Sequence, residues 1–167
     1  MPIIQTNRLQ LRHITPSDAA FLFDLYNQDA FIEHIGDRGL SSLSKTREFI
    51  QAVQANYEKY GFWLYLLEDE QSLEPIGVNG LVQRDYLDAP DMGFAISEAY
   101  WGQGFAYESS QAVLEHARKL KLNKLYAIIS PGNNASIRLI EKLGFVFVKQ
   151  EQLTPGENAV NLYQIIL

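Results

Sequence analysis

The hydrophobic pattern of this chain changes its period at Gly61, and that change constrains the fold more than any other feature. Before Gly61, apolar residues recur at helical spacing in two stretches. After it, three short apolar runs follow one another as in a meander, and then helical and strand patterns alternate. We therefore expect strands at 8–14, 62–67, 75–82, 91–96, 124–129, 145–151 and 160–167, and helices at 16–28, 44–59, 103–120 and 135–143. This order predicts a mixed α/β fold.

Local signals mark the helix starts in the first half of the chain. Thr15 and Asp18 form a variant capping box around Pro16, which favours the first helical position. Ser44 can cap the second helix. The stretch 29–43 has no clean period and contains two glycines, so we expect a loop there. The expected core positions of these two helices are Ala19, Leu22, Phe23, Tyr26, Phe49, Val53 and Tyr57.

Length and composition indicate one domain over residues 1–167 and exclude several classes of function. The chain has 167 residues, which is near the usual size of one domain. Its formal net charge of −6 argues against a nucleic-acid or anionic-membrane binder. Cysteine is absent, which removes disulfides, thiolate zinc sites and a cysteine nucleophile.

The three histidines lack metal-ligand spacing, so we expect no metal. No leader or membrane-spanning pattern is evident, and we expect a cytoplasmic protein. The oligomeric state stays open.

A glycine-containing turn joins the strand at 91–96 to the helix at 103–120. Gly102 and Gly104 let the backbone approach a ligand closely, and the first helical turn presents unpaired N–H groups backed by the helix dipole. Backbone amides can bind a pyrophosphate without any basic side chain, which suits an acidic chain. The alternative is that the glycines only permit a tight turn. Glu108, one turn into the helix, should point away from a bound phosphate.

A second strand–turn–helix unit follows at 124–143. Asn133 and Asn134 lie between the strand and the helix, where asparagine also favours turns and helix caps. Gly144 is placed to end the helix in the left-handed conformation, with Phe145 packing back on Ile140 in a Schellman arrangement.

Taken together, these segments resemble the GNAT superfamily of acyl-CoA-dependent N-acetyltransferases, in the branch of the ribosomal-protein N-acetyltransferases RimJ and RimL. The matching pieces span nearly the whole chain in family order: 6–12, 76–77, 101–108 and 133–145. The resemblance implies a central, mostly antiparallel mixed sheet of about seven strands, splayed between strands 4 and 5 and flanked by about four helices. It also implies acetyl-CoA as co-substrate, with the pantetheine arm pairing with the edge of strand 4, here 92–96.

The resemblance assigns a set of cofactor-binding residues. The family's phosphate loop usually begins with Gln or Arg, and Trp101 fills that place here, while Gly104 and Ala106 match the rest. The pyrophosphate is expected on the N–H groups of 103–107. Arg138 and Lys142 could meet the 3′-phosphate of CoA or form a solvated face. The expected cofactor-binding residues are Phe94, Ala95, Ile96, Gln103, Gly104, Phe105, Ala106, Tyr107, Asn133 and Arg138.

The expected chemistry is direct attack by an amine on the thioester in a ternary complex, because an acyl-cysteine route needs a residue that the chain lacks. The resemblance gives the oxyanion an N–H donor near 94–96. Ile140 stands where many relatives carry a tyrosine acid, and Ser136 matches a serine given that role in the RimL-like branch, although it could simply cap its helix.

The general base is a choice among acidic residues and one histidine. Glu157, just before the last strand, is one candidate, and His34 in the early loop is another. Glu33 and Asp37 share that loop, and a solvated loop would explain all three equally well. His13 and His116 lie on faces that look packed, which indicates structural roles.

Two other functions compete with an acetyltransferase. A catalytically silent CoA-binding or sensor module would have the same fold, and the absence of the tyrosine acid at Ile140 leaves this function open. A Rossmann-type dinucleotide binder fits poorly, because Gly102 and Gly104 follow several strands and no G-x-G-x-x-G opens the chain. The acceptor, a protein N-terminus or a small-molecule amine, would lie in a groove shaped by 29–43 and 86–90.

Overall fold

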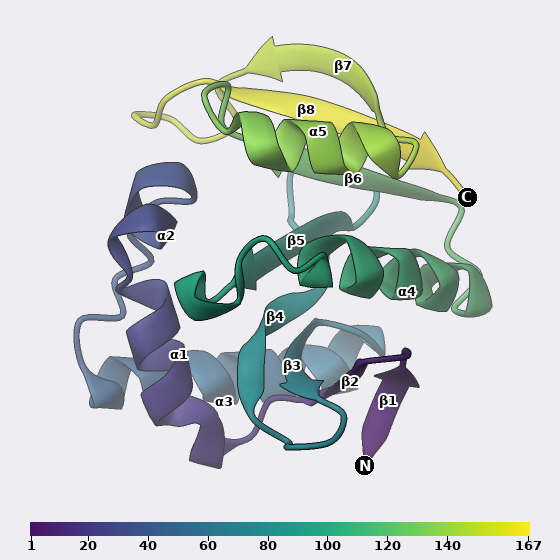
Figure 1. The fold of residues 1–167 in the computed structure, drawn as a ribbon. Coiled ribbons are helices and arrows are strands. Elements are labelled where there is room, and N and C mark those ends of the chain that lie inside the picture. Colours follow the sequence, from purple (N-terminus) through teal and green to yellow (C-terminus); the bar gives the residue numbers. More distant parts are fainter.

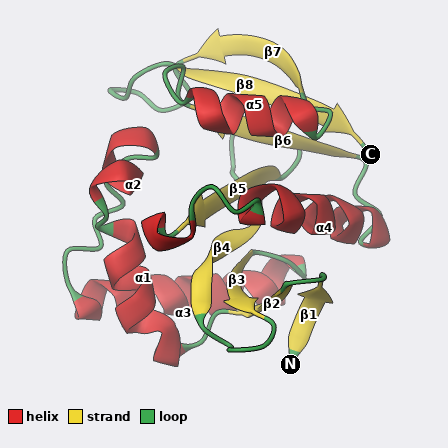
Figure 2. Cartoon of the chain, viewed as in Figure 1, coloured by secondary structure: helices red, strands yellow, loops and turns green.

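A computed structural model describes residues 1–167 and contains one eight-stranded sheet (Figures 1 and 2). The strands are β1 (Pro2–Gln5), β2 (Leu9–His13), β3 (Leu64–Asp69), β4 (Pro75–Val82), β5 (Asp91–Ile96), β6 (Lys124–Ile129), β7 (Val146–Glu151) and β8 (Val160–Ile166). The helices are α1 (Ala19–Tyr26), α2 (Asp29–His34), α3 (Leu43–Tyr60), α4 (Phe105–Lys119) and α5 (Asn134–Lys142). Short 3₁₀ turns occupy Pro16–Asp18 and Glu98–Tyr100. The strands and long helices predicted from the sequence are all present.

The sheet divides between β5 and β6, which are the fourth and fifth of the predicted strands. Its order is β1-β2-β3-β4-β5-β6-β8-β7, and only the β5–β6 pairing is parallel. That pairing contains a single registered pair, Asp91 with Tyr126, supported by the bond from the Tyr126 N–H to the Pro90 carbonyl at 2.8 Å. Beyond Asp91 the two strands separate. The predicted splay is therefore confirmed.

Helices cover both parts of the divided sheet. In the view of Figure 1, α3 lies behind the first half of the sheet and α4 lies in front of β4 and β5, while α5 packs against β6. The buried core is continuous and draws on α1, α3, α4 and the central strands. None of the helices combines the length and the apolar character needed to cross a bilayer.

Two elements were missed by the sequence analysis, so the sheet has eight strands rather than about seven and the helices number five rather than about four. β1 is too short and too exposed to show an alternation, and it is held only by antiparallel pairing with β2. α2 occupies part of the predicted loop at 29–43, and its six residues are too few to reveal a helical period.

Smaller corrections concern helix starts and core positions. The cap of α3 is Ser42, whose side chain accepts from the Lys45 N–H at 3.1 Å, so the predicted cap at Ser44 is wrong. In α1, Ala19, Leu22 and Tyr26 are buried as predicted, but Leu25 rather than Phe23 completes the buried face. The Schellman ending of α5 is confirmed by bonds from Gly144 N–H to Glu141 and from Phe145 N–H to Ile140.

Candidate active site

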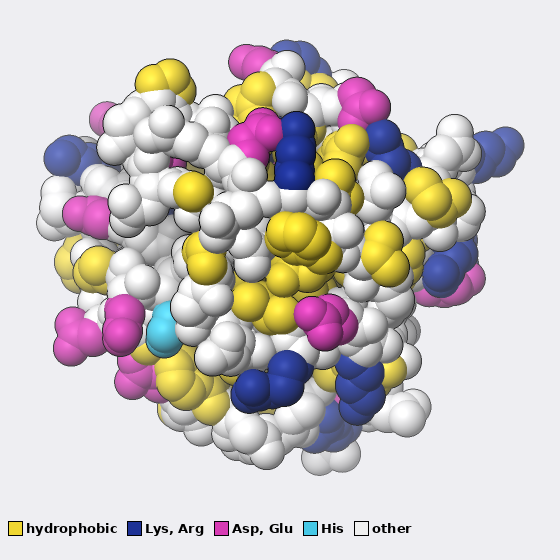
Figure 3. Space-filling model, turned by 90° about the horizontal axis from the view of Figure 1, so that it is seen from above, with side chains coloured by type: hydrophobic (Ala, Val, Ile, Leu, Met, Phe, Trp, Pro, Cys, Tyr) yellow, Lys and Arg dark blue, Asp and Glu magenta, His cyan; other side chains and the backbone are white.

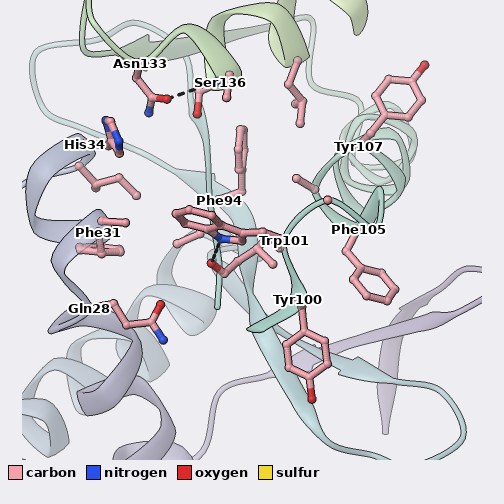
Figure 4. Close-up of a pocket in the computed structure, with 18 of the residues that line it drawn as sticks. Gln28, Phe31, His34, Phe94, Tyr100, Trp101, Phe105, Tyr107, Asn133 and Ser136 are labelled. Atoms are coloured by element: carbon pink, nitrogen blue, oxygen red, sulfur yellow. Dashed lines mark hydrogen bonds between the residues drawn. The ribbon is translucent and has the colours of Figure 1, made fainter. Parts of the chain in front are cut away.

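A cavity of about 470 Å³ opens where the sheet divides (Figure 4). This size is in the range of small-molecule sites. Its walls come from α1 and α2 on one side, from β5 and the turn after it in the middle, and from the starts of α4 and α5 on the other side. The lining residues are Leu25, Gln28, Ala30, Phe31, His34, Ile35, Phe94, Ala95, Ile96, Tyr100, Trp101, Gly102, Gly104, Phe105, Ala106, Tyr107, Asn133, Ala135, Ser136 and Leu139.

The floor of the cavity is the free edge of β5. Ser97 donates its N–H to the Ile76 carbonyl in β4 at 2.9 Å. Because backbone groups alternate in direction along a strand, the N–H of Ala95 also faces β4, whereas the backbone groups of Phe94 and Ile96 face the gap toward β6. The Ile96 carbonyl accepts from the indole N–H of Trp101 at 2.7 Å. The backbone of Phe94 is left for a ligand.

The N-terminus of α4 faces the same cavity. Gly102 and Gly104 have φ of 74° and 81°, in the left-handed region that glycine adopts without strain, and Gly104 is the N-cap residue. No side chain caps this helix. The N–H groups of Phe105, Ala106 and Tyr107 therefore have no partner within the helix, and the dipole adds positive potential there. This is the local geometry of an anion-binding helix start.

An ion-pair network from the N-terminal strand region holds this turn, and the sequence analysis missed it. Arg8 donates from Nε to Glu108 at 2.7 Å and from Nη1 to the Gln103 carbonyl at 2.8 Å, and its guanidinium lies 4.3 Å from the centre of the Phe105 ring. Thr6 donates its hydroxyl to Glu108 at 2.6 Å. Partial burial by itself would raise the pKa of Glu108, but the hydrogen bonds from Thr6 and Arg8 lower it below its ordinary value. The Glu108 carboxylate thus stays ionised and is paired with Arg8.

The start of α5 contributes Asn133 and Ser136 to the opposite wall. Asn133 is the N-cap, and its Oδ1 accepts from the Ser136 N–H at 3.4 Å (Figure 4). Ser136 therefore does not cap the helix, and its side chain lies among the lining residues. Ile140 is fully buried.

α2 closes the remaining side of the cavity and is tied to both halves of the sheet. At its start, Gln28 donates from Nε2 to the Ser97 hydroxyl at 3.1 Å and accepts from the Glu98 N–H at 3.2 Å. At its end, the His34 carbonyl accepts from the Ser130 hydroxyl, which follows β6, at 3.1 Å. The His34 ring and the Phe31 side chain lie on the cavity side in Figure 4.

Several predicted site residues are not brought into the cavity. Gln103 and Arg138 are exposed outside the lining, and Gln103 offers its carbonyl to Arg8 instead. Lys142 lies over the Tyr107 ring at 4.2 Å, beside the start of α4. Glu157 is exposed in the β7–β8 loop, where its carbonyl accepts from Gln152 at 2.6 Å. Glu157 lies outside the cavity lining, and its role as a base stays a prediction.

The other acidic and imidazole groups also lie outside the cavity lining. Glu33 and Asp37 are exposed to solvent. His116 is partly buried and bonds to the Tyr65 hydroxyl at 3.1 Å, and the exposed His13 stacks on Tyr57 with ring centres 4.0 Å apart. No group of three or more His, Cys, Asp or Glu side chains is placed to hold a metal ion.

At this cavity the open edge of a divided sheet meets a helix N-terminus. Such a site suits a class of protein that binds an extended ligand with an anionic group at one end. The sequence of residues 8–146 matches the acetyltransferase (GNAT) domain. The chain belongs to the GNAT acetyltransferase family and is an acyltransferase of the type that acts with acetyl-CoA.

One protein is similar to this chain in sequence, and two solved structures are similar to it in fold. The chain is 33% identical over 147 residues to the uncharacterised protein YkkB of Bacillus subtilis (strain 168), covering 86% of this chain and 85% of YkkB. It shares its fold with the ribosomal L7/L12 α-N-protein acetyltransferase RimL in complex with coenzyme A, with a TM-score of 0.83, 22% identity and coverage of 100% and 98% of the two chains. The chain also shares its fold with spermidine N-acetyltransferase from Vibrio cholerae, with a TM-score of 0.79, 22% identity and coverage of 96% of each chain.

Proposed function

We propose that this protein transfers an acetyl group from acetyl-CoA to a primary amine by direct attack within a ternary complex. The observation that carries the proposal is that one cavity joins the open edge of β5 and the start of α4 on one side to the wall formed by α2 on the other. Donor and acceptor can therefore meet above Phe94. The absence of cysteine excludes an acyl-cysteine intermediate.

The donor end of the cavity is the end at α4. The pyrophosphate would accept hydrogen bonds from the N–H groups of residues 103–107, and the 3′-phosphate would approach Lys142 or Arg138 at the mouth. The pantetheine arm would run along β5, where Phe94 and Ile96 direct backbone groups into the gap. Because Trp101 already occupies the Ile96 carbonyl, Phe94 is the position with both backbone groups available.

Three side-chain and backbone roles complete the chemistry. The Phe94 N–H would donate to the oxyanion that develops on the thioester oxygen. His34 would accept the proton of the attacking amine, directly or through a water molecule; it has the only imidazole among the lining residues, none of which is acidic. The Ser136 hydroxyl would donate a hydrogen bond to the departing thiolate and relay a proton to it from water, so that the serine ends the step protonated. The demand is modest because a thiolate, whose thiol has a pKa of about 8.5, is a weak base.

The alternative is a silent CoA-binding module of the same fold, and one experiment separates the two functions. CoA release from acetyl-CoA is followed with a thiol reagent in the presence and absence of amines. Since the chain has no cysteine, every thiol that the reagent detects comes from CoA. The proposal expects release that depends on the amine. Binding of acetyl-CoA, seen as a thermal shift, with no release for any amine or peptide N-terminus would establish the silent module instead.

A further inference from the structure

The end of the cavity at α2 contains no charged side chain. None of the lining residues of the whole cavity is Asp, Glu, Lys or Arg. At the α2 end the surface comes from Leu25, Ala30, Phe31 and Ile35, which are all apolar. The amide of Gln28 is already used by Ser97 and Glu98. His34 is left as the hydrogen-bonding side chain on that helix.

Hydrogen bonds at both ends of α2 hold this wall against the sheet. The bonds of Gln28 to the end of β5 and of Ser130 to the end of α2 anchor the helix on both halves of the sheet. Phe31 is buried, and its ring packs edge-on against Tyr26 with centres 4.5 Å apart. The acidic residues of α2, Asp29 and Glu33, are exposed to solvent and do not line the cavity.

An apolar and anchored wall discriminates among amines by their second group. A cation taken out of water without a partner of opposite charge pays a large desolvation cost, whereas an alkyl or aromatic group gains from burial. The reacting nitrogen does not bear this desolvation cost in the attacking form, because it must be a neutral amine to attack. A second ammonium group on the same acceptor remains charged and bears the full cost.

We propose that the acceptor is an amine whose body beyond the reacting nitrogen is apolar and uncharged, and that polycationic amines are poor acceptors. This inference rests on the proposed acetyl transfer and deepens it, because it names the class of acceptor. Leu25, Phe31 and Ile35 form the surface that recognises the body of that amine.

The test uses matched pairs of amines of equal length. Hexylamine and 1,5-diaminopentane differ by a methyl group in place of a second ammonium, and 2-aminoheptanamide and lysine amide make the same comparison for an α-amine. Thiol release is measured at one pH with each amine. We expect kcat/KM to be at least about tenfold higher for the apolar member of each pair, although 1,5-diaminopentane offers two reactive ends.

A pair of variants locates the discrimination at α2. Ala30 is partly exposed in the first turn of α2, where an aspartate is compatible with the helix dipole. Ala30→Asp adds a carboxylate to the lining, and Ala30→Asn adds the same shape without the charge. We expect Ala30→Asp to raise kcat/KM for 1,5-diaminopentane by about tenfold, and we expect Ala30→Asn to leave the ratio of the two amines unchanged.

The outcomes separate this inference from the proposed function. Transfer to both members of each pair at equal rates, or faster transfer to the cationic members, would overturn the inference and leave acetyl transfer intact. An unchanged ratio in Ala30→Asp would overturn the assignment of the α2 wall. Failure of every amine to release thiol, with acetyl-CoA still bound, would overturn the proposed function itself.

Discussion

Arg8 is expected to control CoA affinity although it lies outside the cavity lining. In Arg8→Gln the first turn of α4 loses the bonds that the guanidinium makes to the Gln103 carbonyl and to Glu108. The bonds to Glu108 from the Thr6 hydroxyl and from the N–H of residue 8 remain. The carboxylate of Glu108 then faces the phosphate loop without its counter-charge. Both changes should weaken the binding of a polyanionic ligand at the helix start.

The size of the effect follows from the exposure of these groups. The Arg8 side chain is 44% exposed and that of Glu108 is 20% exposed, so their ion pair is partly screened and contributes about 0.5 kcal/mol. The stacking of the guanidinium on Phe105 adds about 0.5 kcal/mol. The hydrogen bond to Gln103 adds roughly 0.5 kcal/mol. Together they amount to about 1.5 kcal/mol, which sets an upper limit of roughly a tenfold rise in the Kd for CoA.

Calorimetric titration of CoA into four proteins tests this reasoning. Arg8→Gln should raise Kd by up to about tenfold, and Glu108→Gln alone should leave it near the wild-type value. Arg8→Gln/Glu108→Gln should recover part of the loss, since the uncompensated charge is gone. A wild-type Kd in Arg8→Gln would refute the role of Arg8. A double variant no better than Arg8→Gln would refute the electrostatic part and leave only the positioning of the turn.

Three further predictions concern catalysis and stability. Ser136→Ala should lower kcat by ~10- to 100-fold with an unchanged Kd for CoA; unchanged turnover would remove Ser136 from the mechanism. Burial lowers the pKa of His116, so the folded state favours the neutral ring and the free energy of unfolding should fall as the pH drops below 6.5. Urea titrations at pH 7.5 and 5.5 should show this fall, reduced in His116→Gln. Gly77→Ala would place a Cβ 2.3 Å from the Ala95 carbonyl oxygen and should destabilise by about 2 kcal/mol or more. Gly93→Ala meets nothing within 4 Å and should change the melting temperature little.

The features predicted from the sequence are those that local chemistry determines. The turn at Gly102 and Gly104 needs left-handed backbone, and its position between a strand and an amphipathic helix was readable from neighbouring residues alone. The Gly144 ending of α5 is equally local. The order of helices and strands followed from the hydrophobic periods. The division of the sheet was predicted from the family resemblance.

The features that were missed depend on contacts between distant segments. Arg8 and Glu108 are 100 positions apart, and no local pattern pairs them. α2 is a six-residue helix whose role depends on bonds to Ser97 and Ser130, far along the chain. The place of Glu157 outside the cavity lining could not be predicted for a related reason, because proximity to the last strand in sequence does not fix the direction of a loop.

An uncharged cavity suits both proposed substrates, which resolves an apparent conflict between an acidic chain and a polyanionic donor. The net charge of −6 repels CoA, but the cavity lining contains no Asp or Glu and presents amides, hydroxyls, an imidazole, an indole and apolar groups. At the acceptor end the same lack of charge disfavours an ammonium and favours the neutral amine, since burial lowers the pKa of a cationic acid. In the proposed transfer, desolvation at α2 would therefore contribute to the deprotonation of the amine. His34 would then need only to accept a proton that the amine already holds weakly, so a single imidazole would suffice where the lining contains no carboxylate.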